Sequence, residues 1–176
     1  MTQPDDKKLR RIDASGAPVF TDLELPDHTG RTRQLSEIAG GDPVALIFSR
    51  GWWCPKDQRQ MEGLARLQEE FEVAYSTLVV VSTDPPEVQA AYRAGLRASF
   101  LFLSDVERRY IDVLGLRETT DPRHNPYRPA AYTLYPDLRV HREYNGYWFW
   151  GRPTAEEIRR DMREISAAIR PDWELS

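Results

Sequence analysis

The stretch VALIFSRGWWCPKD, residues 44–57, determines the fold that we expect. Its first five residues, Val44 to Phe48, are continuously apolar and rich in β-forming types, which is typical of a strand buried on both faces. Pro55 suits the first position of a helix. Beyond it, apolar residues recur at intervals of three and four, as on one helical face: Met61, Leu64, Leu67 and Phe71. The stretch therefore predicts a central strand, a short loop and a helix that begins directly after Cys54.

Cys54 is the N-cap of this predicted helix. At a helix start, the unpaired backbone N–H groups and the positive end of the helix dipole stabilise a thiolate over a thiol. Arg50 lies close enough in the sequence to add positive charge. Because the thiolate is the nucleophilic form, this placement predicts a reactive cysteine. The alternative is a structural thiol, since free cysteines often serve as small apolar core residues.

Strands and helices alternate on both sides of residues 44–57. A hairpin is expected near the N-terminus, where residues 19–25 are followed by turn chemistry at residues 27–30 and a short second strand. Further strands are expected at residues 77–81, 100–103, 130–135 and 139–144. Further helices are expected at residues 84–96, 104–115 and 154–169. Residues 117–128 are rich in proline, asparagine and charge, which predicts a long loop of the kind that often carries function.

This order predicts a mixed central sheet with helices on both faces, joined by right-handed crossovers. The fold class is therefore α/β. A length of 176 residues fits one domain. Residues 1–15 are polar and charged, so we expect a flexible tail there and a single domain over residues 16–176.

Composition excludes several classes of function. The chain has 24 Lys and Arg against 28 Asp and Glu, and the basic residues are scattered, so nucleic acid is not an expected partner. No apolar run approaches the roughly 18 residues of a membrane-spanning helix, and the opening MTQPDDKKLRRID lacks the apolar core of a secretion signal. The lone cysteine excludes an internal disulfide and suits a reducing compartment. We expect a cytoplasmic protein that contacts no membrane.

Several motifs resemble one known family over residues 16–169. FSRGWWCP, residues 48–55, is similar to the Arg-Gly-x-Trp-Cys-Pro-x-Cys motif of the peroxiredoxin-like branch of the thioredoxin fold, the alkyl hydroperoxide reductase C and thiol-specific antioxidant (redoxin) family. Residues 23–35 resemble the N-terminal hairpin of that family, and residues 79–83 resemble its strand ending in Val-Val-Ser. Pro129 falls where thioredoxin-like proteins place a cis-proline opposite the cysteine.

The resemblance implies a thioredoxin-like fold and a thiol peroxidase. Cys54 would reduce hydrogen peroxide or an organic hydroperoxide and become a sulfenic acid, which an external thiol would recycle. Trp52 and Trp53 would wall the substrate pocket, with Pro129 opposite the cysteine. No metal or organic cofactor is implied. The alternative is a non-enzymatic protein of the same fold that binds a partner or senses oxidation.

Two departures from the family pattern affect the site. Asp57 stands where the motif has its second cysteine, so no dithiol mechanism carries over. Gly51 stands where typical peroxiredoxins have Thr or Ser, and Pro129 stands where they have Arg. A peroxidase needs donors aimed at the oxygen on which charge develops. Arg50 and Arg128 are the nearest replacements in the sequence, although Arg128 could equally be a surface residue of the loop.

Asp57 has two interpretations. As an acidic residue in the first helical turn, it would complement the helix dipole. Facing the cysteine, it would disfavour the thiolate by like-charge repulsion and could exchange a proton with it. Among the histidines, His124 could approach Cys54 because it shares a loop with Arg128, whereas the positions of His28 and His141 indicate no metal site.

The aromatic run Tyr147-Trp148-Phe149-Trp150 is the other unusual segment. Core packing under the last helix is one interpretation. The other is an exposed interface for a partner protein or a second subunit, as in a homodimer.

Overall fold

β5 (Val44–Phe48) is the central strand of the sheet, as its continuous apolar run predicts. The computed structural model describes residues 11–12, 16–145 and 151–172. Its five-stranded sheet has the order β7-β6-β5-β8-β9. β6 (Thr77–Ser82) and β7 (Leu101–Ser104) run parallel to β5, whereas β8 (Ala130–Leu134) and β9 (Val140–Tyr144) continue the sheet in antiparallel fashion. The expected mixed sheet is confirmed.

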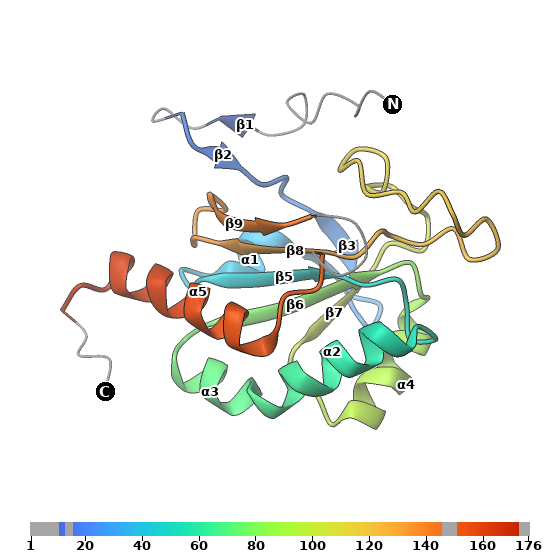
Figure 1. Ribbon diagram of the computed structural model, residues 1–176, viewed down its shortest axis with the longest axis horizontal. Coiled ribbons are helices and arrows are strands. Elements are labelled where there is room, and N and C mark those ends of the chain that lie inside the picture. The colour runs from blue at the N-terminus through green and yellow to red at the C-terminus, as the bar shows by residue number, and fades with distance from the viewer. Residues whose placement is uncertain (1–10, 13–15, 146–150, 173–176) are drawn as a thin grey trace.

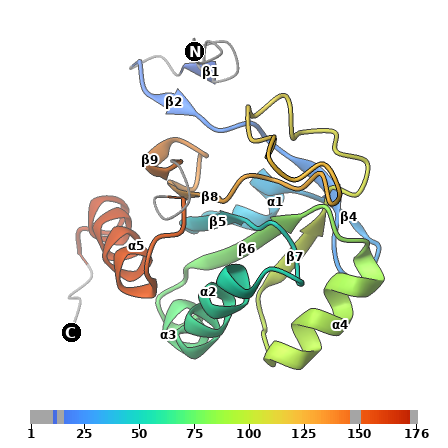
Figure 2. The same ribbon diagram turned by 45° about the vertical axis from the view of Figure 1, so that its right-hand side comes forward.

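Helices cover both faces of this sheet, as Figures 1 and 2 show. One face is covered by α2 (Pro55–Arg66), α3 (Gln68–Val73), α4 (Pro86–Leu96) and α5 (Ala155–Ile169). The other face is covered by α1 (Leu35–Ala39) and the hairpin of β3 (Glu24–Pro26) and β4 (Thr32–Gln34). Alternate side chains of β5 enter the two apolar clusters, because successive strand residues point to opposite faces. The thioredoxin-like fold with an N-terminal hairpin is confirmed.

The helices that carry the site are anchored by buried apolar residues. Met61 and Leu64 of α2 and Ile158 and Ile165 of α5 pack into one cluster beneath the sheet. Burying a side chain of this size contributes about 1.5 to 3 kcal/mol. α5 also begins as predicted, with the Thr154 hydroxyl accepting the Glu157 N–H and the Glu157 carboxylate accepting the Thr154 N–H at 2.7 Å. The starts of α2 and α5 are therefore held firmly at the same end of the sheet.

The helix expected over residues 104–115 is wrong, because the chain forms successive turns there. The Ser104 hydroxyl donates to the carbonyl of Asp84 at 2.7 Å instead of capping a helix. The carboxylate of Asp105 accepts two backbone N–H groups of the turns, and Arg108 has a φ of 57°, which no helix accommodates. Val106 is consequently 39% exposed and not part of a packed helical face.

The expectation of a cis-proline at residue 129 is also wrong, because the peptide bond before Pro129 is trans. The Arg128 N–H donates to the carbonyl of Leu116 at 2.6 Å, so the chain enters β8 already paired and extended. The carbonyl of Pro129 packs against Gly151, where any Cβ atom would collide with it. Glycine at position 151 thus lets the segment before α5 pass close to the start of β8.

Two expectations fall mostly or wholly outside the described residues. Of the tail predicted over residues 1–15, the structure describes β1 (Arg11–Ile12), which pairs with β2 (Pro18–Val19). The aromatic run of residues 147–150 lies outside the described part of the chain. Among the helices that are described, none is long and apolar enough to cross a membrane.

Candidate active site

Cys54 is the N-cap of α2, and Pro55 is its first residue, as predicted. β5 ends at Phe48, and a tight turn follows in which the Cys54 N–H donates to the carbonyl of Gly51 at 3.1 Å. The Cys54 carbonyl then accepts the N–H of Gln58 at 2.9 Å, the first hydrogen bond of the helix. The side chain is 3% exposed. The sulfur is therefore held at the positive end of the helix dipole with little contact with water.

Arg152 is the cation at this sulfur. Its Nη2 lies 3.7 Å from Sγ of Cys54, and its Nε donates to Oδ1 of Asp57 at 2.7 Å. Sequence reasoning missed this residue, which lies 98 positions from Cys54 in the chain. The signal in the sequence that could have found it is its place two residues before Thr154, the N-cap of α5. The guanidinium can stabilise a thiolate and hydrogen-bond an oxygen bound to sulfur.

Asp57 is fully buried and holds two parts of the site together. One carboxylate oxygen accepts the N–H of Arg50 at 2.9 Å, and the other forms the ion pair with Arg152. Its role therefore exceeds that of complementing the helix dipole. A buried charge needs such partners, because an unpaired carboxylate in the interior is costly.

The side chain of Arg50 points to the long loop. Its Nη2 is 2.9 Å from Oδ2 of Asp121, and its guanidinium lies 5.0 Å from the centre of the Trp53 ring. His124 stacks on the same ring of Trp53, with ring centres 3.8 Å apart. The Nδ1 atom of His124 is 2.9 Å from Oδ2 of Asp121. Desolvation raises the pKa of Asp121, but hydrogen bonds from His124 and the charge of Arg50 outweigh it and hold that pKa below its usual value.

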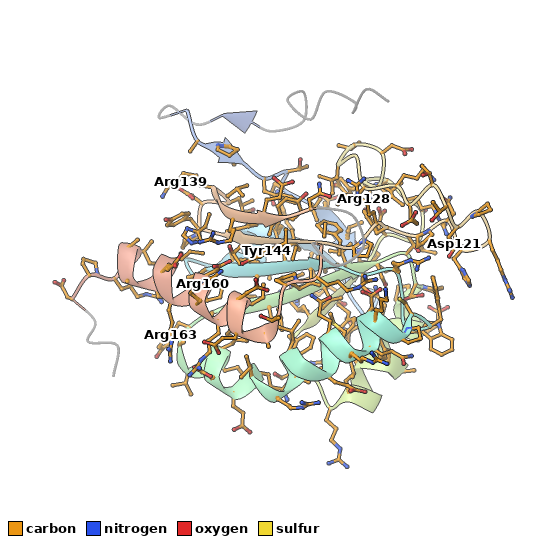
Figure 3. The ribbon with its side chains drawn as sticks, viewed as in Figure 1. Asp121, Arg128, Arg139, Tyr144, Arg160 and Arg163 are labelled. Atoms are coloured by element: carbon orange, nitrogen blue, oxygen red, sulfur yellow. The ribbon has the colours of Figure 1, made fainter. Side chains whose placement is uncertain are left out.

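These contacts place three of the predicted residues. Trp53 belongs to the turn that carries Cys54, and His124 meets Trp53 through the stacking contact. The Arg128 guanidinium instead hydrogen-bonds to the carbonyl of Gly115 at 3.3 Å and to the Asn145 side chain at 2.9 Å. Figure 3 shows Asp121 at the end of the molecule where α2 begins and Arg128 farther from that helix. Arg152 therefore takes the position at the sulfur for which Arg50 and Arg128 were considered.

A second buried carboxylate, Asp84, supports the cysteine turn from the loop that follows β6. It accepts the N–H of Trp52 at 3.1 Å and the hydroxyl of Ser82 at 2.9 Å. Burial raises the pKa of Asp84, opposed by the hydrogen bonds from Ser82 and Trp52 and reinforced by the nearby charge of Asp57. The turn is thus tied to the sheet on one side and to α2 on the other.

Trp52 is one of the residues that line a groove between α2 and α4. Its side chain is 49% exposed. The groove has a volume of about 580 Å³, and its walls are mostly apolar. Two carboxylates, Glu62 and Glu87, also line it. The other lining residues are Gln58, Val88, Ala91, Tyr92, Gly95 and Leu96. Trp52 is therefore largely open to solvent beside the active site, whereas Trp53 is half-buried and stacks on His124.

A cluster of potential metal ligands, His141, Asp161 and Glu164, lies away from this site. Asp161 is buried and already paired with Arg142 at 3.0 Å and Arg160 at 3.1 Å. These arginines neutralise the carboxylate, so the cluster has the composition of a structural ion-pair network.

A thioredoxin-like sheet, a cysteine at the N-cap of the following helix and an arginine at its sulfur define a thiol redox protein. Residues 17–142 match the AhpC/TSA family. The chain belongs to that family, which confirms the resemblance of its motifs.

Known relatives agree with this assignment. Two curated proteins of Mycobacterium tuberculosis, both described as peroxiredoxins, are 28% identical over 122 residues, which is 69% of this chain and 79% of each of them. A crystal structure of a peroxidoxin from the same organism is similar with a TM-score of 0.75 at 24% identity, covering 85% of this chain and 96% of that one. A peroxiredoxin 6 mutant of Arenicola marina has a TM-score of 0.76 at 14% identity, covering 89% and 78%. These structures share the fold.

Proposed function

We propose that the protein is a single-cysteine thiol peroxidase. The observation that carries the proposal is the pairing of Cys54, at the start of α2, with Nη2 of Arg152 at 3.7 Å. The helix dipole and the guanidinium both place positive charge at the sulfur, and the thiolate is the nucleophile that peroxide reduction requires. Membership of the AhpC/TSA family supports the same activity.

In the first step, the thiolate of Cys54 attacks the hydroperoxide oxygen that carries the hydrogen. A sulfur–oxygen bond forms, the O–O bond breaks, and the leaving oxygen takes a proton from water. The sulfur is thereby oxidised to a sulfenic acid, and the peroxide is reduced to water or an alcohol. Arg152 is placed to hold the oxygen as charge moves onto it, a role in which preorganised donors are most effective.

Recycling needs an external thiol. Cys54 is the one cysteine of the 176-residue sequence, so no internal thiol can attack the sulfenic acid. One thiol would form a mixed disulfide with Cys54 and release water, and a second thiol would free Cys54 as a disulfide leaves. The lone cysteine suits a reducing compartment, which supports a cytoplasmic location.

The substrate class includes hydrogen peroxide and organic hydroperoxides. Two structural neighbours support this range. One is a reduced peroxiredoxin of Vibrio vulnificus in complex with hydrogen peroxide, and the other is a Xanthomonas campestris protein described by its alkyl peroxide reduction. The apolar groove beside Trp52 offers room outside the cysteine turn for an organic substituent.

The test is peroxide consumption in the presence of dithiothreitol, with Cys54→Ser as the matched control. We expect consumption in proportion to parent protein and none above background with the variant. A parent no faster than the variant would contradict the peroxidase activity. If the parent's Cys54 still reacted once with peroxide but did not turn over, the alternative of a redox sensor would replace it.

A further inference from the structure

The indole N–H of Trp53 has no hydrogen-bond partner among the residues that the structure describes. It nevertheless lies inside the cysteine turn. A Cβ atom at position 51 would be 2.6 Å from Nε1 of Trp53 and 3.1 Å from its Cδ1. The N–H edge of the ring therefore occupies the space that a side chain at position 51 would fill.

Gly51 is what allows the indole to lie there. Its φ is 137°, a conformation that other residues rarely adopt, and its carbonyl accepts the N–H of Cys54. Oδ1 of Asp84 also lies 3.1 Å from the position of a Cβ atom at residue 51. An N–H donor and a carboxylate acceptor thus border the turn that presents Cys54. A hydroperoxide offers the complementary groups, an O–H donor and oxygen acceptors.

The ring is fixed before any substrate binds. His124 stacks on it at 3.8 Å with an angle of 16° between the planes, and Arg50 lies 5.0 Å from its centre. Asp121 joins these two neighbours, at 2.9 Å from each. Residues of the long loop therefore hold the indole in place, and a preorganised donor loses little entropy when it is used.

We propose that the Nε1–H of Trp53 is a catalytic hydrogen-bond donor in the peroxidase reaction, replacing the Thr or Ser side chain that the family pattern has at position 51. This inference rests on the proposed function. When the Cys54 thiolate attacks and the O–O bond breaks, negative charge develops on the leaving oxygen. The indole N–H donates to that oxygen, while Arg152 contacts the sulfur from the side of α5. His124 is a positioning residue that acts through the ring.

The test compares Trp53→Phe with the aromatic control Tyr75→Phe in single-turnover oxidation of the reduced protein by hydrogen peroxide. Phenylalanine keeps an aromatic face for His124 but has no N–H. We expect Trp53→Phe to slow oxidation of Cys54 by about 10², the scale for loss of one preorganised donor. Alkylation by iodoacetamide, which breaks no O–O bond, should stay close to the parent rate. Tyr75→Phe should match the parent in both assays, because Tyr75 is 58% exposed and follows α3, outside the site.

The outcomes are distinguishable. A parent that does not react with peroxide would overturn the proposed function itself. A reactive parent matched by Trp53→Phe would overturn the donor role alone. Equal losses in peroxide reaction and alkylation would also overturn it, since they would show that the ring merely shapes the turn.

If Trp53→Phe unfolds, replacing the indole by benzothiophene, which has the same shape and lacks only the N–H, provides the same comparison. His124→Ala should slow the peroxide reaction by a smaller factor than Trp53→Phe.

Discussion

Cys54, Arg152 and Asp57 form a chain of contacts in which each residue has a different task. The sulfur receives a guanidinium nitrogen at 3.7 Å, and the same guanidinium is held through Nε by a fully buried carboxylate. Removing the carboxylate would leave a largely buried arginine without its ion-pair partner in Asp57. The position of Arg152 at the sulfur therefore depends on Asp57, although Asp57 makes no hydrogen bond to the sulfur itself.

Arg152→Ala should slow the reaction of Cys54 with peroxide by about 10² or more, because it removes a donor that faces the sulfur. It should also slow alkylation, because the sulfur loses the positive charge that lies beside it. Rapid mixing with hydrogen peroxide and with iodoacetamide measures the two effects. Arg128→Ala and Arg50→Ala are the matched controls, and we expect smaller losses from both. A loss at Arg128 equal to that at Arg152 would contradict the assignment.

The free energy of unfolding of Asp84→Asn should increase relative to that of the parent protein as the pH rises. The folded protein raises the pKa of Asp84, chiefly by burial, so folding favours its protonated form. Asp84 therefore contributes most below its ordinary pKa, and that contribution is lost as the pH rises through the raised value. Asparagine stays neutral and can still accept the N–H of Trp52. The measurement is the free energy of unfolding of both proteins from about pH 4 to about pH 7. If the variant becomes less stable relative to the parent protein as the pH rises, this prediction is wrong.

Residue types predicted the nucleophile but not its partner. Cys54 before Pro55, after a buried strand, carries a local signal of an activated thiol. Arg152 lies far away in the sequence, and its approach depends on Gly151 packing against Pro129, which no local pattern encodes. Arg50 and Arg128 were plausible because they are close to the expected site, but Asp121 and Asn145 bind their guanidinium groups.

At the scale of elements, the start of α2 organises the site. Positions 54 and 57 are the N-cap and the third residue of the helix, so their side chains lie near the same edge of its first turn. Both face inward, as their burial shows. A cysteine at position 57 should therefore reach Cys54.

Asp57→Cys should form an internal disulfide when it is oxidised by peroxide, because the geometry of a helix N-terminus suits such a pair. The variant should lose about two mass units and resist further oxidation, whereas the parent should add oxygen. Intact mass spectrometry distinguishes the two. Cys54→Ser combined with Asp57→Cys is the control and should lose no mass. If the double-cysteine protein stays reduced or oxidises further, the side chains at positions 54 and 57 do not share a face.

Elements with strong periodic patterns were predictable, and one element built on a short signal was not. β5, α2 and α5 have long apolar patterns that agree with their packing. The predicted helix after Ser104 rested on its spacing to Glu107, but the carboxylate of Asp105 captures the backbone N–H groups of a turn. A side chain that competes for backbone donors can override a capping pattern.

At the scale of the whole molecule, the fold was predictable because strands and helices alternate around one buried strand. The crossover rule then leaves few arrangements of the sheet. The contacts between the long loop and the cysteine turn were not predictable. They are the ion pair of Arg50 with Asp121 and the stacking of His124 on Trp53. They join residues from two loops whose meeting depends on the complete tertiary structure. The composition of the loop indicated its length and its irregularity, but not its contacts.

The proposed peroxidase reaction requires Cys54 to be a peroxide-reactive nucleophile with no internal thiol to protect its product. Intact mass spectrometry of the reduced protein, after one equivalent of hydrogen peroxide, tests it directly. We predict the addition of one oxygen at Cys54, reversal by dithiothreitol, and progression to two or three oxygens only with excess peroxide. If Cys54 stays unmodified while methionines oxidise, the thiol is structural and the claim is wrong.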